Sequence, residues 1–143
     1  MDKLNTVVFY TIERAIKTYR QYAQKQIKLA NLNITIDQWL TIKSIMDNPG
    51  ISQQEIAERV FKDNASVTRI IDLLEKANYL KRTTDKTDKR RSLLKVTDEG
   101  KKIINNVYKV VLKNRETALK GINKKDIETT EKVLNTIILN CKN

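Results

Sequence analysis

The residues best suited to contact a partner lie in residues 63–96, in two neighbouring groups. The first group is polar and lies at the start of a predicted helix, where the hydroxyls of Ser66 and Thr68 are followed by the guanidinium of Arg69. Such groups donate hydrogen bonds to base edges and to phosphate oxygens. A helix N-terminus adds free N–H groups that favour anions. The pattern indicates contact with a nucleic acid, and a polar helix face that meets only solvent is the alternative.

The second group is basic and lies on the predicted loop of residues 84–91. Residues 81–95 include seven basic and two acidic residues, which supplies +5 of the whole chain's net charge of +11. A general solubility role would not concentrate charge in this way. An arginine at the tip of such a loop can enter a narrow minor groove, where the negative potential is raised. The charge therefore favours a polyanionic partner, with DNA preferred, and a solvated charged hairpin is the alternative.

The remaining composition excludes several kinds of site. The chain has no His and a single Cys, Cys141, so neither a zinc site of the usual type nor a Ser-His-Asp triad can be assembled. No glycine-rich phosphate loop is present, which leaves an enzyme as the weakest interpretation and indicates no cofactor. The lone Cys141 fits a reducing cytoplasm and is expected to be a small buried hydrophobe. No apolar run approaches the ~18 residues of a membrane span, so we expect no membrane insertion.

Two helices joined by a short turn are predicted to position the polar group. Three start signals precede the helices of this region: Thr35 with Gln38, Ser52 with Glu55, and Asp63 alone. The first helix ends near Asp47, before Asn48-Pro49-Gly50, and the second ends near Val60. The short helix, the turn and the helix that follows form a helix-turn-helix pattern.

The other predicted elements flank this pattern. Residues 79–83 and 92–96 are expected to form the two strands of a hairpin around the basic loop. Apolar residues at steps of three and four predict amphipathic helices over residues 3–31, 97–121 and 123–141. The first of these has a longer apolar stripe than one small core can cover, so we expect part of it to pack on another subunit. Trp39 is expected to anchor the core.

The order and spacing of these motifs resemble the MarR family of bacterial transcription regulators. The resemblance covers nearly the whole chain and is most specific across residues 35–100. It is carried by Thr35-x-x-Gln38-Trp39, Pro49-Gly50-x-Ser52-Gln53, Glu55-Ile56-Ala57, Asp63-x-x-Ser66-Val67-Thr68-Arg69, Asp72-x-Leu74-Glu75, Asp88-Lys89-Arg90-Arg91 and Val96-Thr97-x-x-Gly100. The hairpin motif followed by the Thr-x-x-Gly segment is the most specific part.

The resemblance implies a mainly α fold with a small β-hairpin, in which a winged helix-turn-helix is carried by helices that form a homodimer. The expected divisions are an N-terminal dimerisation helix in residues 1–34, a DNA-binding region in 35–100 and C-terminal dimerisation helices in 101–143. One helix would lie in the major groove and the hairpin, or wing, in the minor groove, with Arg90 at its tip. Asp88 is expected to brace the wing by facing an arginine. The candidate DNA contacts are Ser52, Asn64, Ser66, Thr68, Arg69, Lys89, Arg90 and Arg91.

The resemblance further implies a repressor that leaves its operator when a small aromatic or phenolic compound binds near the junction of the dimer with the DNA-binding region. The sequence assigns no ligand residues. Five side chains could line such a pocket, although core or dimer packing is the expected role of most: Tyr10, Arg14, Tyr19, Tyr22 and Trp39. Peroxide-sensing members use a cysteine in the first helix, which this chain lacks. A winged helix that binds protein, or RNA by its shape, is the alternative function.

Overall fold

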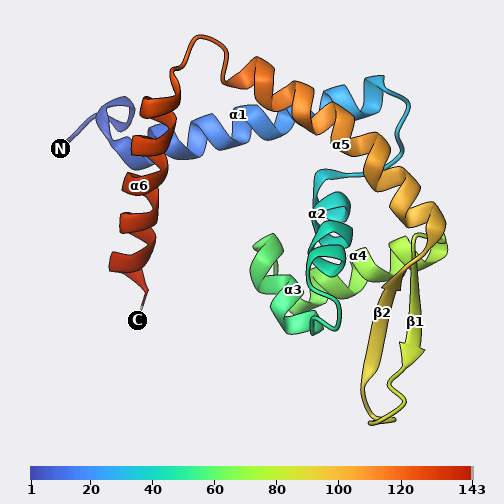
Figure 1. Cartoon of the computed structure of the whole chain (residues 1–143). Helices are drawn as coiled ribbons and strands as arrows, with labels where there is room; N and C mark the ends of the chain where they lie inside the picture. The colour runs from blue at the N-terminus through green and yellow to red at the C-terminus, as the bar shows by residue number, and fades with distance from the viewer. Residues whose placement is uncertain (143) are drawn as a thin grey trace.

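The protein is mainly helical, with one small antiparallel hairpin, as the sequence predicts (Figure 1). The computed structural model describes residues 1–142. In chain order its main elements are α1 Val8–Leu29, α2 Ile36–Asp47, α3 Gln53–Val60, α4 Asn64–Lys76, β1 Leu80–Thr84, β2 Ser92–Val96, α5 Asp98–Ala118 and α6 Lys124–Cys141. None of the helices in residues 1–142 combines the length and the apolar character needed to cross a membrane.

The first predicted helix is interrupted near its start. A single 3-10 turn, Leu4–Thr6, precedes an extended Val7, and only then does α1 begin. The Thr6 hydroxyl donates to the Lys3 carbonyl at 2.7 Å and closes this short turn locally. The apolar period continues across the interruption, which is why the sequence pattern does not reveal it.

The caps of the helix-turn-helix match the sequence with one exception. The Thr35 hydroxyl accepts from the Gln38 N–H at 3.1 Å, and the Gln38 side chain accepts from the Thr35 N–H at 3.0 Å, so the predicted capping box is confirmed. The Ser52 hydroxyl likewise caps α3 by accepting from the Glu55 N–H at 3.1 Å. The reciprocal half of this second box is absent, because the Glu55 carboxylate accepts from the Ser52 hydroxyl instead.

One hydrophobic core joins the helix-turn-helix to the hairpin and to α5. Its most deeply buried members come from six elements, α1 included: Ile27, Ile42, Ile56, Val67, Ile71, Leu74, Leu80 and Val107. They recur at helical steps along α2, α3 and α4, so each helix turns one face inward and leaves the other for contacts. Trp39 is only 7% exposed and belongs to this core, which confirms its expected role as an anchor.

The Thr-x-x-Gly segment fixes the start of α5 against the end of α4. The Thr97 hydroxyl donates to the Asn78 carbonyl at 2.6 Å and also accepts from the Gly100 N–H at 3.0 Å. A Cβ atom on Gly100 would lie 2.3 Å from the Tyr79 carbonyl oxygen, so no larger residue fits there without movement. This segment therefore sets the direction in which the long helix α5 leaves the helix-turn-helix and the hairpin.

The last helix stands apart from the rest of the chain. In Figure 1, α1 and α5 lie side by side, whereas α6 lies at the end of this pair remote from the hairpin and runs down past the start of α1. α6 has no buried residue, and Val133, Ile138 and Leu139 on it are half or more exposed. Cys141 is exposed as well, so the expectation that it is buried is wrong. The apolar stripe is present, but one chain provides no surface to cover it.

Candidate nucleic-acid interface

The polar edge of α4 is open at its N-terminal end. Thr68 and Arg69 are exposed and Ser66 is half-buried. The Arg69 guanidinium donates to the Ser66 hydroxyl at 3.3 Å, and the Thr68 hydroxyl donates to the Asn64 carbonyl at 2.9 Å. The four predicted contact residues of this helix thus form two hydrogen-bonded pairs near its start, and Arg69 has further donors that its bond to Ser66 does not use.

Gln53 joins this group, although the sequence patterns do not single it out as a contact. Its side-chain amide, at the start of α3, donates to the Thr68 hydroxyl at 2.7 Å and lies 3.4 Å from the Asn64 carbonyl. The neighbouring Ser52 is half-buried and occupied in capping α3. In the sequence, Gln53 stands out only as the last residue of the Pro49-Gly50-x-Ser52-Gln53 motif, directly after the cap where α3 begins.

The carboxylate of Asp63 caps the N-terminus of α4, and its pKa is lower than usual. Its Oδ1 accepts from the Ser66 N–H at 2.7 Å. This backbone hydrogen bond, and then the Ser66 hydroxyl, hold the pKa of Asp63 below its ordinary value of 3.8. An ionised cap beside the positive end of the helix dipole fixes the first turn of α4, where the contact residues lie.

The wing keeps its basic tip in solvent. β1 and β2 pair from Leu80 opposite Val96 to Thr84 opposite Ser92, so the first strand is one residue later than predicted. The Arg90 side chain is 96% exposed. Asp88 accepts from the Arg90 N–H at 3.1 Å and lies 3.6 Å from its Nε. Asp88 therefore faces an arginine of the wing, and the rest of the guanidinium is free to meet a partner.

A second carboxylate orders the start of the same loop. Asp85 accepts from the Thr87 N–H at 2.9 Å and from the Thr87 hydroxyl at 2.8 Å. These bonds, the backbone one first, lower the pKa of Asp85 below its ordinary value. The loop closes with the Asp85 N–H donating to the Arg91 carbonyl at 2.9 Å. The tip is thus held by short-range bonds that leave Lys89 and Arg90 exposed.

Two arginines fasten the wing to the helix-turn-helix. Arg82 on β1 forms an ion pair with Glu75 at 2.7 Å and a longer one with Asp72 at 3.4 Å, both on α4. Arg91 donates to the Gly50 carbonyl, in the turn before α3, at 2.8 Å. Arg91, predicted as a DNA contact, therefore also ties the base of the wing to the body. The sequence does not predict this role of Arg82, because Asp72 and Glu75 become its partners only when the hairpin folds against α4.

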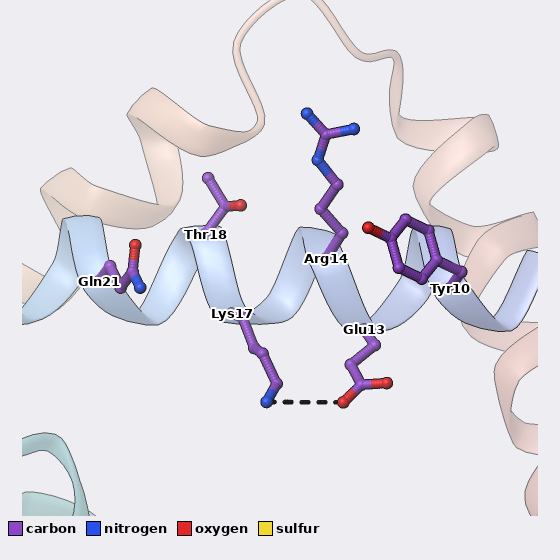
Figure 2. A pocket seen from close by; sticks show the side chains of 6 residues that line it. All are labelled: Tyr10, Glu13, Arg14, Lys17, Thr18 and Gln21. Carbon is purple, nitrogen blue, oxygen red and sulfur yellow. Dashed lines mark ion pairs between the residues drawn. The ribbon is translucent and has the colours of Figure 1, made fainter. Parts of the chain in front are cut away.

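Two open hollows lie along the surface of α1. The first, of about 340 Å³, is shown in Figure 2. There Glu13 and Lys17 pair at 3.5 Å on one side of the helix, and Arg14 points to the other. The second hollow, of about 640 Å³, lies between α1 and the end of α5. Its walls combine small, aromatic and hydroxyl side chains with one cation: Thr11, Arg14, Ala15, Thr18, Tyr19, Tyr22, Thr117 and Ala118.

The hollows bring together four of the five side chains considered for a ligand pocket. Arg14 lines both, Tyr19 and Tyr22 line the larger one, and Tyr10 lines the smaller one. Trp39 is separate, in the core. Within residues 1–142 no cluster of three His, Cys, Asp or Glu side chains is placed to hold a metal ion.

Comparison with known proteins places this arrangement in a family. The model of the MarR family matches residues 34–92, which contain α2, α3, α4, the first strand and the wing loop. The regulator SarZ of Staphylococcus epidermidis, an HTH-type transcriptional regulator, is 30% identical over 106 residues, which is 73% of this chain and 68% of SarZ. The match to SarZ extends beyond the helix-turn-helix.

Two solved structures share the fold over almost the full length. BpsR of Bordetella bronchiseptica, whose DNA binding is regulated by 6-hydroxynicotinic acid, has a TM-score of 0.85 at 18% identity, with 96% of each chain covered. A mutant of Escherichia coli MarR complexed with operator DNA has a TM-score of 0.84 at 21% identity, covering 96% of this chain and 99% of that one. These structural similarities show the winged-helix fold, and the sequence similarities show the family relationship. The chain therefore belongs to the MarR family of transcriptional regulators and is not an enzyme.

Proposed function

We propose that the protein is a dimeric repressor of transcription. Two copies would bind a pseudo-palindromic operator in double-stranded DNA, and a small aromatic or phenolic compound would release them. The observation that carries the proposal is the pairing of two exposed groups on one rigid unit. The polar edge of α4 and the basic tip of the wing are both exposed to solvent. Arg82 on β1 of the wing forms ion pairs with α4, so the two groups are held on one unit.

The two groups have different tasks in this proposal. Asn64, Ser66, Thr68 and Arg69 would contact base edges and phosphates in the major groove, where hydroxyl and guanidinium donors can distinguish base pairs. Three further contacts complete the interface: Lys89 and Arg90 in the flanking minor groove and Ser52 at the phosphate backbone. Arg91 would add its charge from the base of the wing while its guanidinium remains on Gly50.

The dimer is supported by the apolar surface that one chain leaves uncovered. Large hydrophobic side chains are exposed on α1, α5 and α6: Val8, Phe9, Ile16, Leu112, Val133, Ile138 and Leu139. Large apolar side chains exposed together on these helices support an association site. A two-fold dimer would present two copies of α4, and half-sites about 10 bp apart would match them. In this proposal residues 1–34 and 101–143 associate, residues 35–100 bind DNA, and the protein acts in the cytoplasm.

Release by a small molecule is supported by the larger hollow. Its tyrosines offer aromatic contacts and the Arg14 guanidinium offers a partner for a phenolate or carboxylate. The structural relative BpsR responds to 6-hydroxynicotinic acid, which has both an aromatic ring and an acidic group. A compound that favours the released form over the DNA-bound form by ~1.4 kcal/mol would weaken operator binding tenfold.

The test begins with selection of duplexes from a random DNA pool by the full chain. We expect an inverted repeat with half-sites about 10 bp apart, and binding that weakens steeply with salt. Affinity that does not distinguish DNA sequences would overturn the proposal and favour a winged helix that binds protein or RNA.

The proposed contact of Arg90 with the minor groove is tested by a separate variant. Arg90→Ala should weaken binding to the selected operator by at least tenfold in a gel shift, because a minor-groove arginine is lost, while the unfolding free energy stays unchanged. Lys120→Ala removes the same charge from the exposed turn after α5, at the end of α5 remote from the wing, and is the matched control. Equal binding by the two variants would contradict the role of Arg90.

A further inference from the structure

Polar side chains of α1 hold the segment that leads into α2. The Gln24 amide donates to the Ile34 carbonyl at 3.2 Å, and its oxygen accepts from the Ile36 N–H at 2.9 Å. One side chain thus satisfies two backbone groups on either side of the cap residue Thr35. Because both bonds come from one planar amide, they fix the direction in which the chain enters α2 as well as its distance from α1.

The Asp37 carboxylate lies next to this clamp and joins three parts of the chain. Its Oδ1 is 2.6 Å from a guanidinium nitrogen of Arg20 on α1. Its Oδ2 is 3.5 Å from the Nζ of Lys62, in the turn between α3 and α4. The Asp37 side chain is only 26% exposed, and its backbone carbonyl accepts from the buried Thr41 hydroxyl at 2.8 Å. Asp37 is therefore held on a rigid helix between two cations from distant segments.

The two cations connect the regions that the proposed function assigns to different tasks. Arg20 belongs to the helix assigned to dimerisation. Lys62 directly precedes Asp63, the cap that fixes the first turn of α4. The Arg20–Asp37–Lys62 cluster is thus a short polar connection from the dimerisation helix to the start of the helix that would enter the major groove.

We infer that Asp37 is a positioning residue for DNA binding: through Arg20 and Lys62 it sets the orientation of α4 relative to α1, and hence the half-site spacing that the dimer accepts. The inference rests on the proposed function. Adding one base pair between half-sites moves them apart by about 3.4 Å and rotates one about the DNA axis. A dimer can reject such a change only if each α4 is held firmly against its dimerisation helix. A dimer in which the Arg20–Asp37–Lys62 cluster is broken would bind the altered half-site spacing more nearly as well as the native one.

The experiment compares Asp37→Asn with Asp47→Asn on the selected operator and on versions with one base pair added or removed between the half-sites. Both substitutions remove one carboxylate charge from α2. Within residues 1–142, Asp47 pairs only with Lys43, four residues earlier on the same helix, and forms no ion pair with another element. Duplexes containing a single half-site measure the contacts of one α4 alone. Sedimentation of each variant measures the dimer.

We expect Asp37→Asn to bind the single half-site like the wild type and to dimerise like it. Its preference for the native spacing over the altered spacings should fall on the order of fivefold, the scale of one partly exposed ion pair in each subunit. Asp47→Asn should keep the wild-type preference. A merely structural role of Asp37 would instead lower binding to all the duplexes together, and that result, or an unchanged preference, would overturn the inference.

A substitute variant and the behaviour of the wild-type protein complete the experiment. If Asp37→Asn lost its helical circular dichroism, Arg20→Gln would take its place, because it breaks the same cluster and leaves α2 unchanged; an unchanged spacing preference there would equally overturn the inference. A wild-type protein with no spacing preference at all would instead show that the proposed dimeric operator binding is wrong.

Discussion

Phe61 is an exposed aromatic residue in a backbone conformation that suits glycine. It ends α3 with φ of 60° and ψ of 40°, and the residue is 86% exposed. The Lys62 N–H donates to the Ala57 carbonyl at 3.0 Å and the Phe61 N–H to the Glu58 carbonyl at 3.3 Å, the bonding pattern of a Schellman end. Asn31 and Asn78 end α1 and α4 in the same conformation, and asparagine tolerates it better.

Replacing Phe61 with glycine should therefore stabilise the protein. Relief of the left-handed conformation exceeds the extra entropy of glycine in the unfolded chain, so Phe61→Gly should raise the unfolding free energy by about 0.5–1 kcal/mol. Urea denaturation measures the change, and Asn78→Gly, with less strain to relieve, is the control. Destabilisation by Phe61→Gly would mean that the aromatic ring has a packing role that its exposure conceals.

The cap of α4 should make stability depend on acid. The folded pKa of Asp63 lies below 3.8, so its contribution is complete above that value and is lost as the pH falls through the lower, folded-state pKa. Asn caps a helix without titrating. Asp63→Asn should therefore be about as stable as the wild type at neutral pH and lose less stability on acidification to about pH 3. Parallel pH dependences of the two unfolding free energies would contradict the assigned cause.

At the scale of the elements, the corner between α4, β1 and α5 is tightly packed around Gly100. Gly100→Ala would place a methyl group 2.3 Å from the Tyr79 carbonyl oxygen and 2.8 Å from Val96 Cγ1. The backbone cannot move aside without breaking the Thr97 bonds, so we expect a loss of about 1–3 kcal/mol in unfolding free energy. Thermal denaturation against Glu99→Ala, at the exposed neighbouring position, would measure it. A Gly100→Ala protein as stable as that control would show that the corner can relax.

The same elements show which features a sequence can predict. Thr35 with Gln38, Asp63 and Thr97 act on residues three positions away, so their patterns are local and the helix starts are confirmed. The bond from Arg91 to Gly50 spans 41 positions, and no local pattern encodes it. The burial expected for Cys141 is wrong because periodicity shows that a helix has an apolar face but not what covers it.

At the scale of the whole molecule, charge is divided unevenly between the two parts that would meet DNA. Residues 35–80, which include the helix-turn-helix, carry five basic and seven acidic residues, whereas residues 81–95 carry an excess of +5. The attraction to phosphate would therefore come mainly from the wing, and the discrimination between bases mainly from α4. Salt should then affect binding chiefly through the wing residues.

The uncovered α6 has a consequence for how much of the regulator a cell must make. A helix in a protein gains most of its stability from packing its apolar face, and α6 buries none of its residues within one chain. If α6 gains its packing from a second copy, its folding follows the square of the protein concentration rather than the concentration itself. Newly made, dilute chains would then have an end open to proteases, and surviving chains would accumulate only once synthesis outruns that loss. Abundance would thereby respond to expression level with a threshold, before any operator is occupied.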